Sequence, residues 1–228
     1  MIRMLFLSIS ILCAISSYIS DNEKESRLAI MTIRKERLFE KLYSINNDSI
    51  LSIYALSIVA PEISRYSSFE DAIQKRALVL LYVHNNICNF SVGMFQMKPN
   101  FVEQLEKEIL NRPDLHNKYG NLLINNSDEI EIKIERLRRL SDIDWQVRYL
   151  NLFVCIALER IRQWDKELSS DQILKYLATL YNGGINLSKN EVDQLLKLTQ
   201  FPHLSRNQYN YANIALEFFY VLQHSVLR

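Results

Sequence analysis

One carboxylate and two glycine-containing stretches are the residues of this chain that could carry out chemistry together. Glu62 stands beside Pro61 at the end of the apolar run SILSIYALSIVAPEI. A carboxylate at an apolar helix end loses hydration in its ionised form, so its pKa rises and it can act as a general acid near neutral pH. The alternative is that Glu62 faces solvent at a fraying helix end.

Three of the four glycines of the chain lie in two short stretches. Gly93 lies in FSVGMFQMKP, and Gly183 and Gly184 lie in YNGG. Glycine is needed where the chain takes a left-handed turn or where the backbone must approach another group closely. FSVGMFQMKP is therefore either a core strand with an unusual glycine or the floor of a site that presents Gln96. Gly183 and Gly184 alone can be a helix stop.

The elements that must position these residues are helices. Apolar residues recur at intervals of three and four, which predicts a mainly α fold with a short extended segment or small hairpin near residues 88–99. The expected helices cover residues 23–45, 49–64, 69–85, 101–111, 128–140, 145–167, 171–180, 189–199 and 208–227. Three helix starts carry capping boxes, which pair Ser67 with Glu70, Ser169 with Gln172, and Ser188 with Glu191.

The composition is that of an ordinary globular protein. At 228 residues, with 48% hydrophobic and 23% charged residues, the chain can bury roughly 70% of its unfolded surface in a single core. No linker rich in Pro, Gly or Ser divides it, so we expect residues 21–48 to form a helix packed on one domain covering 49–228. The formal charge of +1 argues against a nucleic-acid partner. The oligomeric state stays open.

Two charged stretches predict packed helices with solvated faces. The basic residues Arg136, Arg138 and Arg139 follow acidic residues, which favours a helix surface laced with ion pairs over a nucleic-acid patch. The early helix favours packing over a membrane-surface role. Its apolar stripe consists of Leu28, Met31, Leu38, Leu42 and Ile45.

The first twenty residues have the order of a secretory signal. Arg3 precedes an apolar run, and the polar sequence DNEKES follows it. The run is shorter than the ~20 residues of a spanning helix, so residues 1–20 predict a signal peptide or an N-terminal anchor and an exported protein of the periplasm or cell envelope. Contact with a membrane is expected only through this segment, if it stays uncleaved.

The spacing of the cysteines and histidines predicts neither a metal site nor a cofactor. Cys88 and Cys155 could pair in an oxidising compartment or remain as buried thiols. The histidines have no spacing typical of metal ligands, and they are His84, His116, His203 and His224.

The order of the pieces resembles the lysozyme-like lytic transglycosylases, the family of the soluble lytic transglycosylase catalytic domain. That family has a catalytic Glu closing a helix, a Gly-Leu-Met-Gln-(Ile/Leu)-x-Pro segment, Tyr-Asn-Ala-Gly, and a tyrosine entering the final helix. The counterparts here are Glu62, GMFQMKP at 93–99, YNGG at 181–184, and either Tyr209 or Tyr211, between which spacing does not choose. The resemblance covers about residues 49–222 and implies a lysozyme-like helical domain in a divergent member.

The chain also departs from the family pattern. Ile63 stands where the family has Ser after the catalytic Glu, and Ser64 comes one position later. The distance from Glu62 to Gly93 is longer than usual, Phe90 and Ser91 replace the usual Gly-Ala, and the usual Glu-Thr before the last tyrosine is missing.

A single acid must carry the reaction that the resemblance implies. Ordinary glycosidases use two carboxyl groups, but Glu70 and Asp71, the other acids between Glu62 and Pro99, are explained by a helix start. The resemblance implies that Glu62 protonates the glycosidic oxygen between N-acetylmuramic acid and N-acetylglucosamine, while the substrate's acetamide stabilises the cationic centre. The ionised Glu62 then takes the proton of the muramyl 6-hydroxyl, which gives an anhydro ring.

The resemblance also assigns roles around the expected cleft. In the hairpin segment, Gln96 would hydrogen-bond an acetamido sugar, Gly93 would let the backbone approach the sugar, and Met94 and Phe95 would be divided between core and cleft wall. Peptidoglycan strands are the implied partner.

The remaining roles fall to the later motifs. Tyr181 would bond to Glu62 or the substrate and hold the acid in place, and Asn182 would fix the turn after its helix. Tyr209 or Tyr211 would close the cleft from the last helix. Amphipathic packing is the alternative for all three tyrosines in a chain that has twelve.

Two other functions stay open. The departures near Glu62 would suit a catalytically inactive glycan-binding or assembly module of the same fold. Helical periodicity alone would suit an unrelated partner-binding protein, in which Glu62, Gln96 and Tyr181 would be dispersed rather than line one cleft.

Overall fold

The computed structural model describes residues 26–66, 82–83, 90–201 and 209–226. Over these ranges the chain is mainly helical, as the periodicity predicts. A helical stretch covers residues 26–35. The elements that follow are α2 (Leu38–Asn46), α3 (Ser49–Ile63), α5 (Pro99–Asn111), α6 (Pro113–Tyr119), the 3-10 turn η1 (Gly120–Leu122), α7 (Glu129–Leu140), α8 (Ile143–Trp164), α9 (Ser170–Gly183), α10 (Lys189–Leu195) and α11 (Tyr211–Val226).

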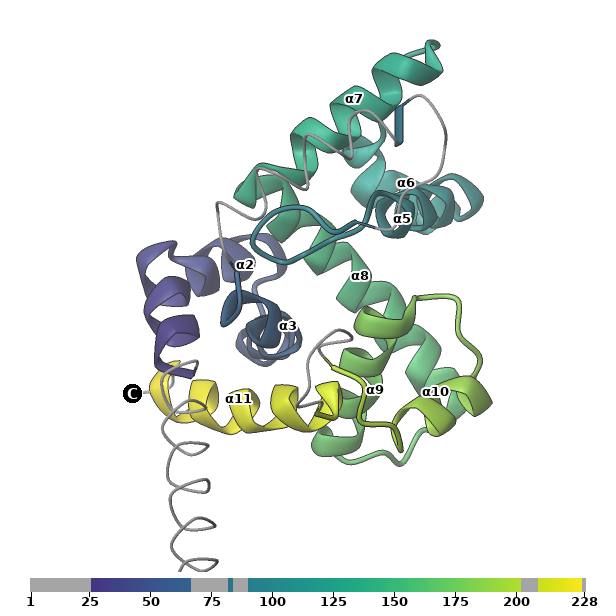
Figure 1. The fold of residues 1–228 in the computed structure, drawn as a ribbon. Helices are drawn as coiled ribbons and strands as arrows, with labels where there is room; N and C mark the ends of the chain where they lie inside the picture. The colour runs from purple at the N-terminus through teal and green to yellow at the C-terminus, as the bar shows by residue number, and fades with distance from the viewer. Residues whose placement is uncertain (1–25, 67–81, 84–89, 202–208, 227–228) are drawn as a thin grey trace, which may run out of the picture.

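Helix α3 forms the centre of the molecule because it is apolar on every side. All its residues from Ser52 to Pro61 are buried, as expected of a helix without a polar face. Its two buried hydroxyls are satisfied locally, since Ser52 donates to the Asp48 carbonyl and Ser57 to the Ile53 carbonyl. Figure 1 shows α3 end-on, with α2, α8, α9 and α11 packed around it.

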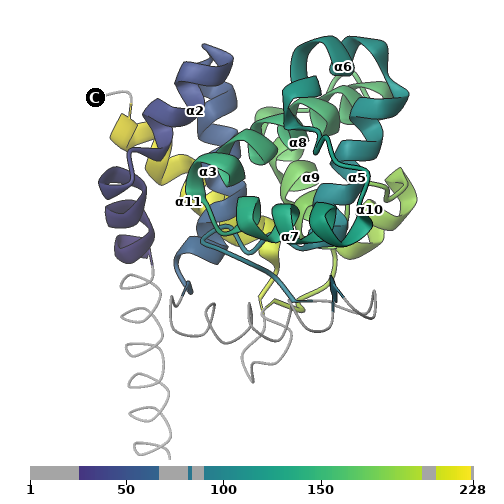
Figure 2. The ribbon, with the colours of Figure 1, turned by 90° about the horizontal axis from the view of Figure 1, so that it is seen from above.

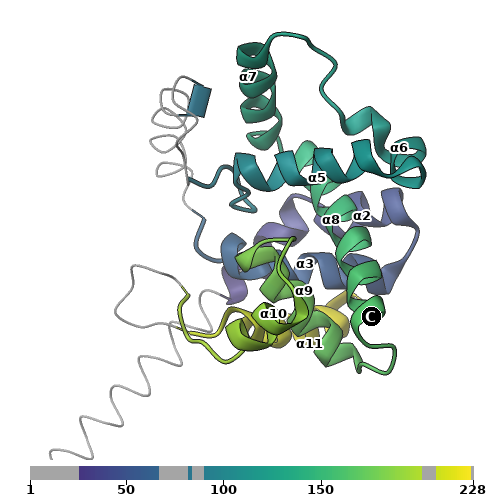
Figure 3. The same cartoon turned by 90° about the vertical axis from the view of Figure 1, so that its right-hand side faces the viewer.

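The other helices lie in two groups on either side of α8. Helices α5, α6 and α7 lie on one side, and α9, α10 and α11 on the other (Figure 1, Figure 3). Seen from above, α2, α3 and α11 occupy one half of the molecule and α5, α6 and α10 the other (Figure 2). The C-terminal end of α3 and the N-terminal end of α5 border the same cavity.

The helix starts follow their capping signals. The predicted capping boxes of Ser169 with Gln172 and of Ser188 with Glu191 are both present. Asp48 adds a side-chain cap to α3, accepting from the Leu51 N–H at 3.0 Å. The predicted box at Ser67–Glu70 lies outside the described residues, as does most of the expected helix over 69–85.

The single helix predicted over 23–45 is wrong. The described part is helical over 26–35 and again in α2, and Arg37 between them has a left-handed backbone (φ 53°). This turn breaks the predicted apolar stripe, so Leu38 and Leu42 are buried while Leu28 and Met31 are 49% and 68% exposed. Ile45, from the same stripe, is also exposed.

Short elements and helix ends also differ from the prediction. The periodicity did not predict α6, which has Pro113 in its first turn, because seven residues give less than two periods of an apolar pattern. Helix α9 continues past the predicted end at Leu180 to Gly183.

The predicted small hairpin is confirmed. Val92 and Met97 form an isolated antiparallel bridge with both backbone hydrogen bonds, at 2.9 and 3.2 Å. The loop of the hairpin is residues 93–96, closed by a bond from the Gln96 N–H to the Gly93 carbonyl. Among the described residues, the other extended pairing is a bridge between Phe201 and Tyr209.

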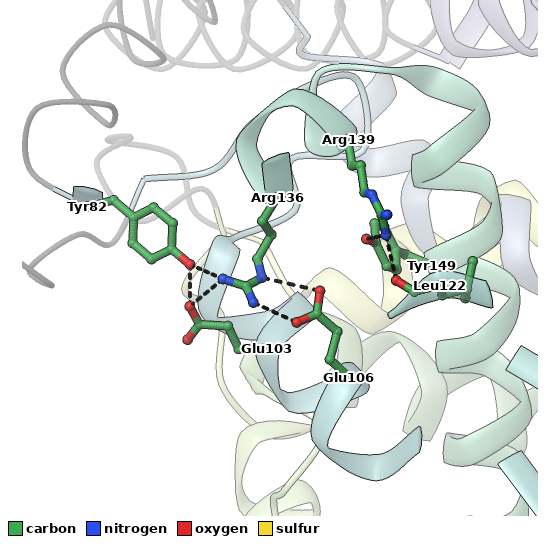
Figure 4. Close-up of polar contacts among 7 residues, drawn as sticks. All are labelled: Tyr82, Glu103, Glu106, Leu122, Arg136, Arg139 and Tyr149. Atoms are coloured by element: carbon green, nitrogen blue, oxygen red, sulfur yellow. Dashed lines mark hydrogen bonds and ion pairs between the residues drawn. The ribbon is translucent and has the colours of Figure 1, made fainter. Parts of the chain in front are cut away.

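The basic cluster on α7 is paired with acids, as predicted, but two of its arginines are buried rather than on the surface. Arg136 crosses to α5, where it forms ion pairs with Glu106 at 2.6 Å and with Glu103 at 3.1 Å (Figure 4). The hydroxyl of Tyr82 bonds to both Arg136 and Glu103. Arg138 alone of the three is exposed, paired with Glu135. Arg136 is drawn inward because its carboxylate partners lie on α5, whereas Arg139 pairs with Glu135 on its own helix.

Arg139 ties α7 to two further elements. It donates to the carbonyl of Leu122 at 2.6 Å and reaches the Tyr149 hydroxyl (Figure 4). Its guanidinium carbon lies 3.9 Å from the ring centre of Trp145, in cation–π contact. Figure 4 also shows that these contacts form a cluster separate from the Arg136 pairs.

Candidate functional site

A cavity of about 410 Å³ opens where α3, the hairpin, α5 and α9 meet. Its wall takes Glu62 from α3, Gln96 from the hairpin and Tyr181 from α9. These are the three residues that the resemblance to lytic transglycosylases expects in one cleft. The other described lining residues are Ser91, Met97, Lys98, Asn100, Phe101, Gln104, Asn182, Gly183, Gly184 and Phe201.

Glu62 is placed to act as an acid. It lies in the last turn of α3 and its side chain is half-buried against the cavity. Burial raises the pKa of its carboxyl to about 7, against the opposing effect of the positive charges of Arg65 and Lys98. Near neutral pH both the protonated and the ionised forms are therefore populated, as a group that first gives and then takes a proton requires.

The hairpin turns Gln96 toward the cavity. Gln96 has a left-handed backbone (φ 51°), and its side-chain amide donates to the Gly93 carbonyl at 2.8 Å. Its side chain is half-buried and lines the cavity. Because the amide nitrogen closes the turn, the carbonyl oxygen of the Gln96 amide can accept a hydrogen bond from a ligand.

The structure explains the glycine at position 93 differently from the prediction. The resemblance predicts that its bare backbone lies against the sugar, but Gly93 is buried and is not among the residues that line the cavity. Its φ is 74°, and a Cβ there would stand 1.6 Å from the Gln146 amide nitrogen and 2.5 Å from the Leu140 carbonyl oxygen. Glycine is required because the hairpin packs tightly on the junction of α7 and α8.

Met94 and Phe95 lie away from the cavity. Phe95 is fully buried in the core, and Met94 is half-buried against it. Neither side chain lines the cavity. The expected division of the pair between core and cleft wall is therefore wrong, and the neighbouring Met97 lines the cavity instead.

Tyr181 braces the hairpin rather than bonding directly to Glu62. Its hydroxyl donates to the Phe95 carbonyl at 2.6 Å. Its ring makes edge contacts with Phe101 and Phe153, each at 5.5 Å between ring centres. Burial and the nearby charge of Glu62 raise the pKa of Tyr181 well above its usual value, so its hydroxyl stays a proton donor.

Tyr209 and Tyr211 line a second cavity, of about 250 Å³, that shares Asn182 with the first. Tyr211 is buried, and its hydroxyl donates to the Ile58 carbonyl of α3 at 2.7 Å. Tyr209 is half-buried and pairs through its backbone with Phe201. Neither tyrosine lines the Glu62 cavity. Asn182 is exposed at the end of α9, on the edge of both cavities.

Gln146 is the positioning residue that the sequence did not reveal. It is buried near the start of α8, and its amide oxygen accepts from the Phe95 N–H at 2.9 Å. Its amide nitrogen donates to the carbonyls of Val92 and Leu140. Gln146 thereby fastens the hairpin to the ends of α7 and α8. A glutamine near a helix start carries no local sign of such a role.

Four polar residues of the cavity wall were also missed, and one of them, Ser91, comes directly before the hairpin. Lys98 precedes α5, while Asn100 and Gln104 lie one turn apart on it. The spacing of four between Asn100 and Gln104 was the available signal, since residues at i and i+4 share a helix face.

The two residues after Glu62 are held within the protein. Ile63 is buried in the core. The hydroxyl of Ser64 donates to the Pro61 carbonyl at 2.9 Å.

The described residues include no cluster of three or more His, Cys, Asp or Glu that could hold a metal ion. In the same part of the chain no helix combines the length and hydropathy needed to cross a lipid bilayer. Cys155 has a free thiol 3.2 Å from the Tyr119 hydroxyl, and its possible partner Cys88 lies outside the described residues.

Comparison with protein-family models, with curated proteins and with solved structures finds no match for this chain.

Proposed function

We propose that this chain is an exported peptidoglycan-cleaving enzyme, a divergent lytic transglycosylase that cuts the MurNAc–GlcNAc bond without water and releases anhydromuropeptides. One observation carries the proposal: Glu62, Gln96 and Tyr181 meet in a single cavity, in which Glu62 is the only carboxylate among the described lining residues. Export rests on the signal-like pattern of residues 1–20, which lie outside the described part of the chain.

The first step requires a protonated acid. With a pKa of about 7, Glu62 holds a proton in a substantial fraction of molecules at neutral pH and gives it to the glycosidic oxygen as the bond breaks. The leaving sugar departs with that proton. The positive charge left on the muramyl ring is stabilised by the substrate's own acetamide.

The second step requires the same group as a base. The ionised Glu62 removes the proton of the muramyl 6-hydroxyl, whose oxygen then bonds to the anomeric carbon and closes the anhydro ring. Glu62 ends the cycle protonated, so protons balance without a water molecule. Two-carboxylate glycosidases would need a second acid across the cavity, and the described wall presents none.

The other groups of the cavity would bind and orient the glycan. The Gln96 amide can bond to an acetamido group, and Tyr181 keeps the hairpin in place through the Phe95 carbonyl. Asn182 at the cavity edge adds a second amide.

A second candidate is a catalytically inactive glycan-binding or assembly module. The observation that favours it is the replacement of the serine after Glu62: Ile63 is buried, and the Ser64 hydroxyl is engaged by Pro61. Such a module would use the same cavity for binding without turnover.

Digestion of purified sacculi tests the proposal. The mature protein and its Glu62→Gln variant are incubated with sacculi, and the soluble muropeptides are analysed by mass spectrometry. We expect anhydromuropeptides from the wild type and a loss of at least about 100-fold in product with Glu62→Gln, the size typical of removing a general acid.

Glu167→Gln is the matched control, because Glu167 is exposed and lies outside the cavity wall. It should digest sacculi at the wild-type rate. Absence of anhydromuropeptides from the wild type would refute the transglycosylase. Products with reducing ends would indicate a hydrolase, and binding that survives Glu62→Gln without any turnover would favour the inactive module.

A further inference from the structure

The proposed reaction leaves one basic side chain of the cavity without a role. Lys98 joins the hairpin to α5 with an extended backbone (φ −87°, ψ 145°), and its side chain lines the cavity without capping the helix. Its charge acts on the Glu62 carboxyl. Lys98 and Glu62 therefore line the same cavity, close enough for their charges to interact.

Positive charge exceeds negative charge in the described wall once Glu62 is protonated. Lys98 is the one basic and Glu62 the one acidic side chain among the described lining residues. Lys98 forms no ion pair with any carboxylate in the described ranges. Arg65, whose guanidinium carbon lies 5.0 Å from the ring centre of Phe201, adds a second positive charge near Glu62.

The rest of the polar wall is uncharged. Gln96, Asn100, Gln104 and Asn182 present amides, which suit the hydroxyl and acetamido groups of a sugar. An ammonium is a compact point charge and forms its strongest hydrogen bonds with anionic oxygens. A neutral sugar would not use Lys98 in this way.

We propose that Lys98 binds a carboxylate of the glycan, so that the cavity selects strands carrying a negative charge beside the bond to be cleaved. This inference rests on the proposed function. In peptidoglycan the carboxylate can belong to the lactyl group of a peptide-free muramyl residue or to a stem peptide. Both sources offer the same chemistry to the ammonium of Lys98.

Binding of a carboxylate at Lys98 would also change the pKa of Glu62. The charged and titratable groups that face Glu62 are Arg65 and Lys98, which lower its pKa, and the hydroxyls of Tyr181 and Tyr211. A bound carboxylate offsets the charge of Lys98 and thereby favours the protonated form of Glu62. By linkage, the protonated enzyme binds the anionic glycan more tightly than the ionised enzyme does.

Calorimetric titration of the full mature chain tests this proposal, in a Glu62→Gln background that prevents turnover. The ligands are a GlcNAc–MurNAc tetrasaccharide with free lactyl carboxylates and the methyl ester of the same tetrasaccharide. We expect the free acid to bind at least about tenfold more tightly than the ester, as one charge-assisted hydrogen bond allows. Adding Lys98→Met should reduce this preference to about twofold or less.

Two further variants separate charge from other effects. Lys98→Arg keeps the charge and should keep most of the preference. Lys107→Met removes one charge from the exposed side of α5 and should leave the preference unchanged.

A second pair of ligands identifies the source of the carboxylate. The pair consists of a peptide-bearing tetrasaccharide and its fully amidated form. A preference that is seen only with this pair, and is lost with Lys98→Met, assigns the carboxylate to the stem peptide.

The outcomes distinguish this inference from the proposed function. If both pairs show equal binding of charged and neutral ligands, or if Lys98→Met retains the preference, the carboxylate site is refuted. Release of anhydromuropeptides in the sacculus assay would then still support the enzyme. If no glycan binds and no product forms, both proposals are refuted.

Discussion

At the scale of single residues, the carboxyl of Glu62 stays protonated in the folded protein at pH values at which it is ionised in the unfolded chain. Its pKa rises from 4.5 to about 7 on burial. Between these two values the folded state binds more protons than the unfolded state, so the free energy of unfolding falls as pH rises through this range. Above pH 7 the full penalty applies, roughly 3 kcal/mol at 1.36 kcal/mol for each pKa unit.

We therefore expect Glu62→Gln to stabilise the protein at alkaline pH. The difference in the free energy of unfolding between the variant and the wild type should be roughly 3 kcal/mol larger at pH 8 than at pH 4. The reason is that the amide of the variant cannot ionise. Urea denaturation at pH 4, 6 and 8 measures the difference. With the exposed Glu167→Gln the difference should stay within about 0.5 kcal/mol at every pH, and a pH-independent effect of Glu62→Gln would show that its pKa is not raised.

At the scale of elements, the hairpin depends on Gln146. Replacing it by Met leaves the Phe95 N–H and the Leu140 carbonyl without their side-chain partner in the interior. We expect Gln146→Met to lower the free energy of unfolding by about 2–4 kcal/mol, and hydrogen exchange should show faster exchange of the Phe95 amide.

The matched control on the same helix is Gln163→Met, since Gln163 is exposed. Its effect should be within about 0.5 kcal/mol. If Gln146→Met behaved like the control and left the Phe95 amide protected, the hairpin would be held by its own bridge alone.

The contact of α5 with α7 depends on a buried ion pair. The side chains of Arg136 and Glu106 are only 7% and 11% exposed, whereas that of Arg138 is 60% exposed. We expect Arg136→Met to destabilise the protein by about 3–5 kcal/mol, because it leaves Glu106 buried without its partner. Arg138→Met, the control on the same helix, should cost about 1 kcal/mol or less.

Thermal or chemical denaturation of the two variants gives the comparison. Combining Arg136→Met with Glu106→Gln should recover part of the loss, because the second change removes the uncompensated charge. Equal, small losses for Arg136→Met and Arg138→Met would contradict a buried network.

At the scale of the whole molecule, the site is formed by segments far apart in the sequence. The end of α3 brings Glu62, the hairpin brings Gln96, and the end of α9 brings Tyr181. Helix α3 also packs on α11, where the Tyr211 hydroxyl donates to the Ile58 carbonyl. The position of the acid thus depends on the packing of the central helix.

The sequence by itself determined the helical character, most helix positions, two of the capping boxes and the hairpin. These follow from local signals: the period of the apolar residues, the cap side chains, and the rarity of glycine. The expectation that Glu62, Gln96 and Tyr181 share a cleft came from the resemblance to a family, not from a local signal. The break at Arg37 escaped prediction because the periodicity continues through it.

Only the tertiary structure decided which side chains share the site. The burial of Arg136, the clamp of Gln146 on the hairpin and the place of Lys98 in the cavity all depend on contacts between distant segments. Gly93 illustrates the difference. Its presence in the sequence indicated a close approach, but a sequence does not show what approaches, and the structure places the Gln146 amide there rather than the cavity. Local patterns encode backbone conformation, whereas the partner of a side chain is set by the packing of the whole chain.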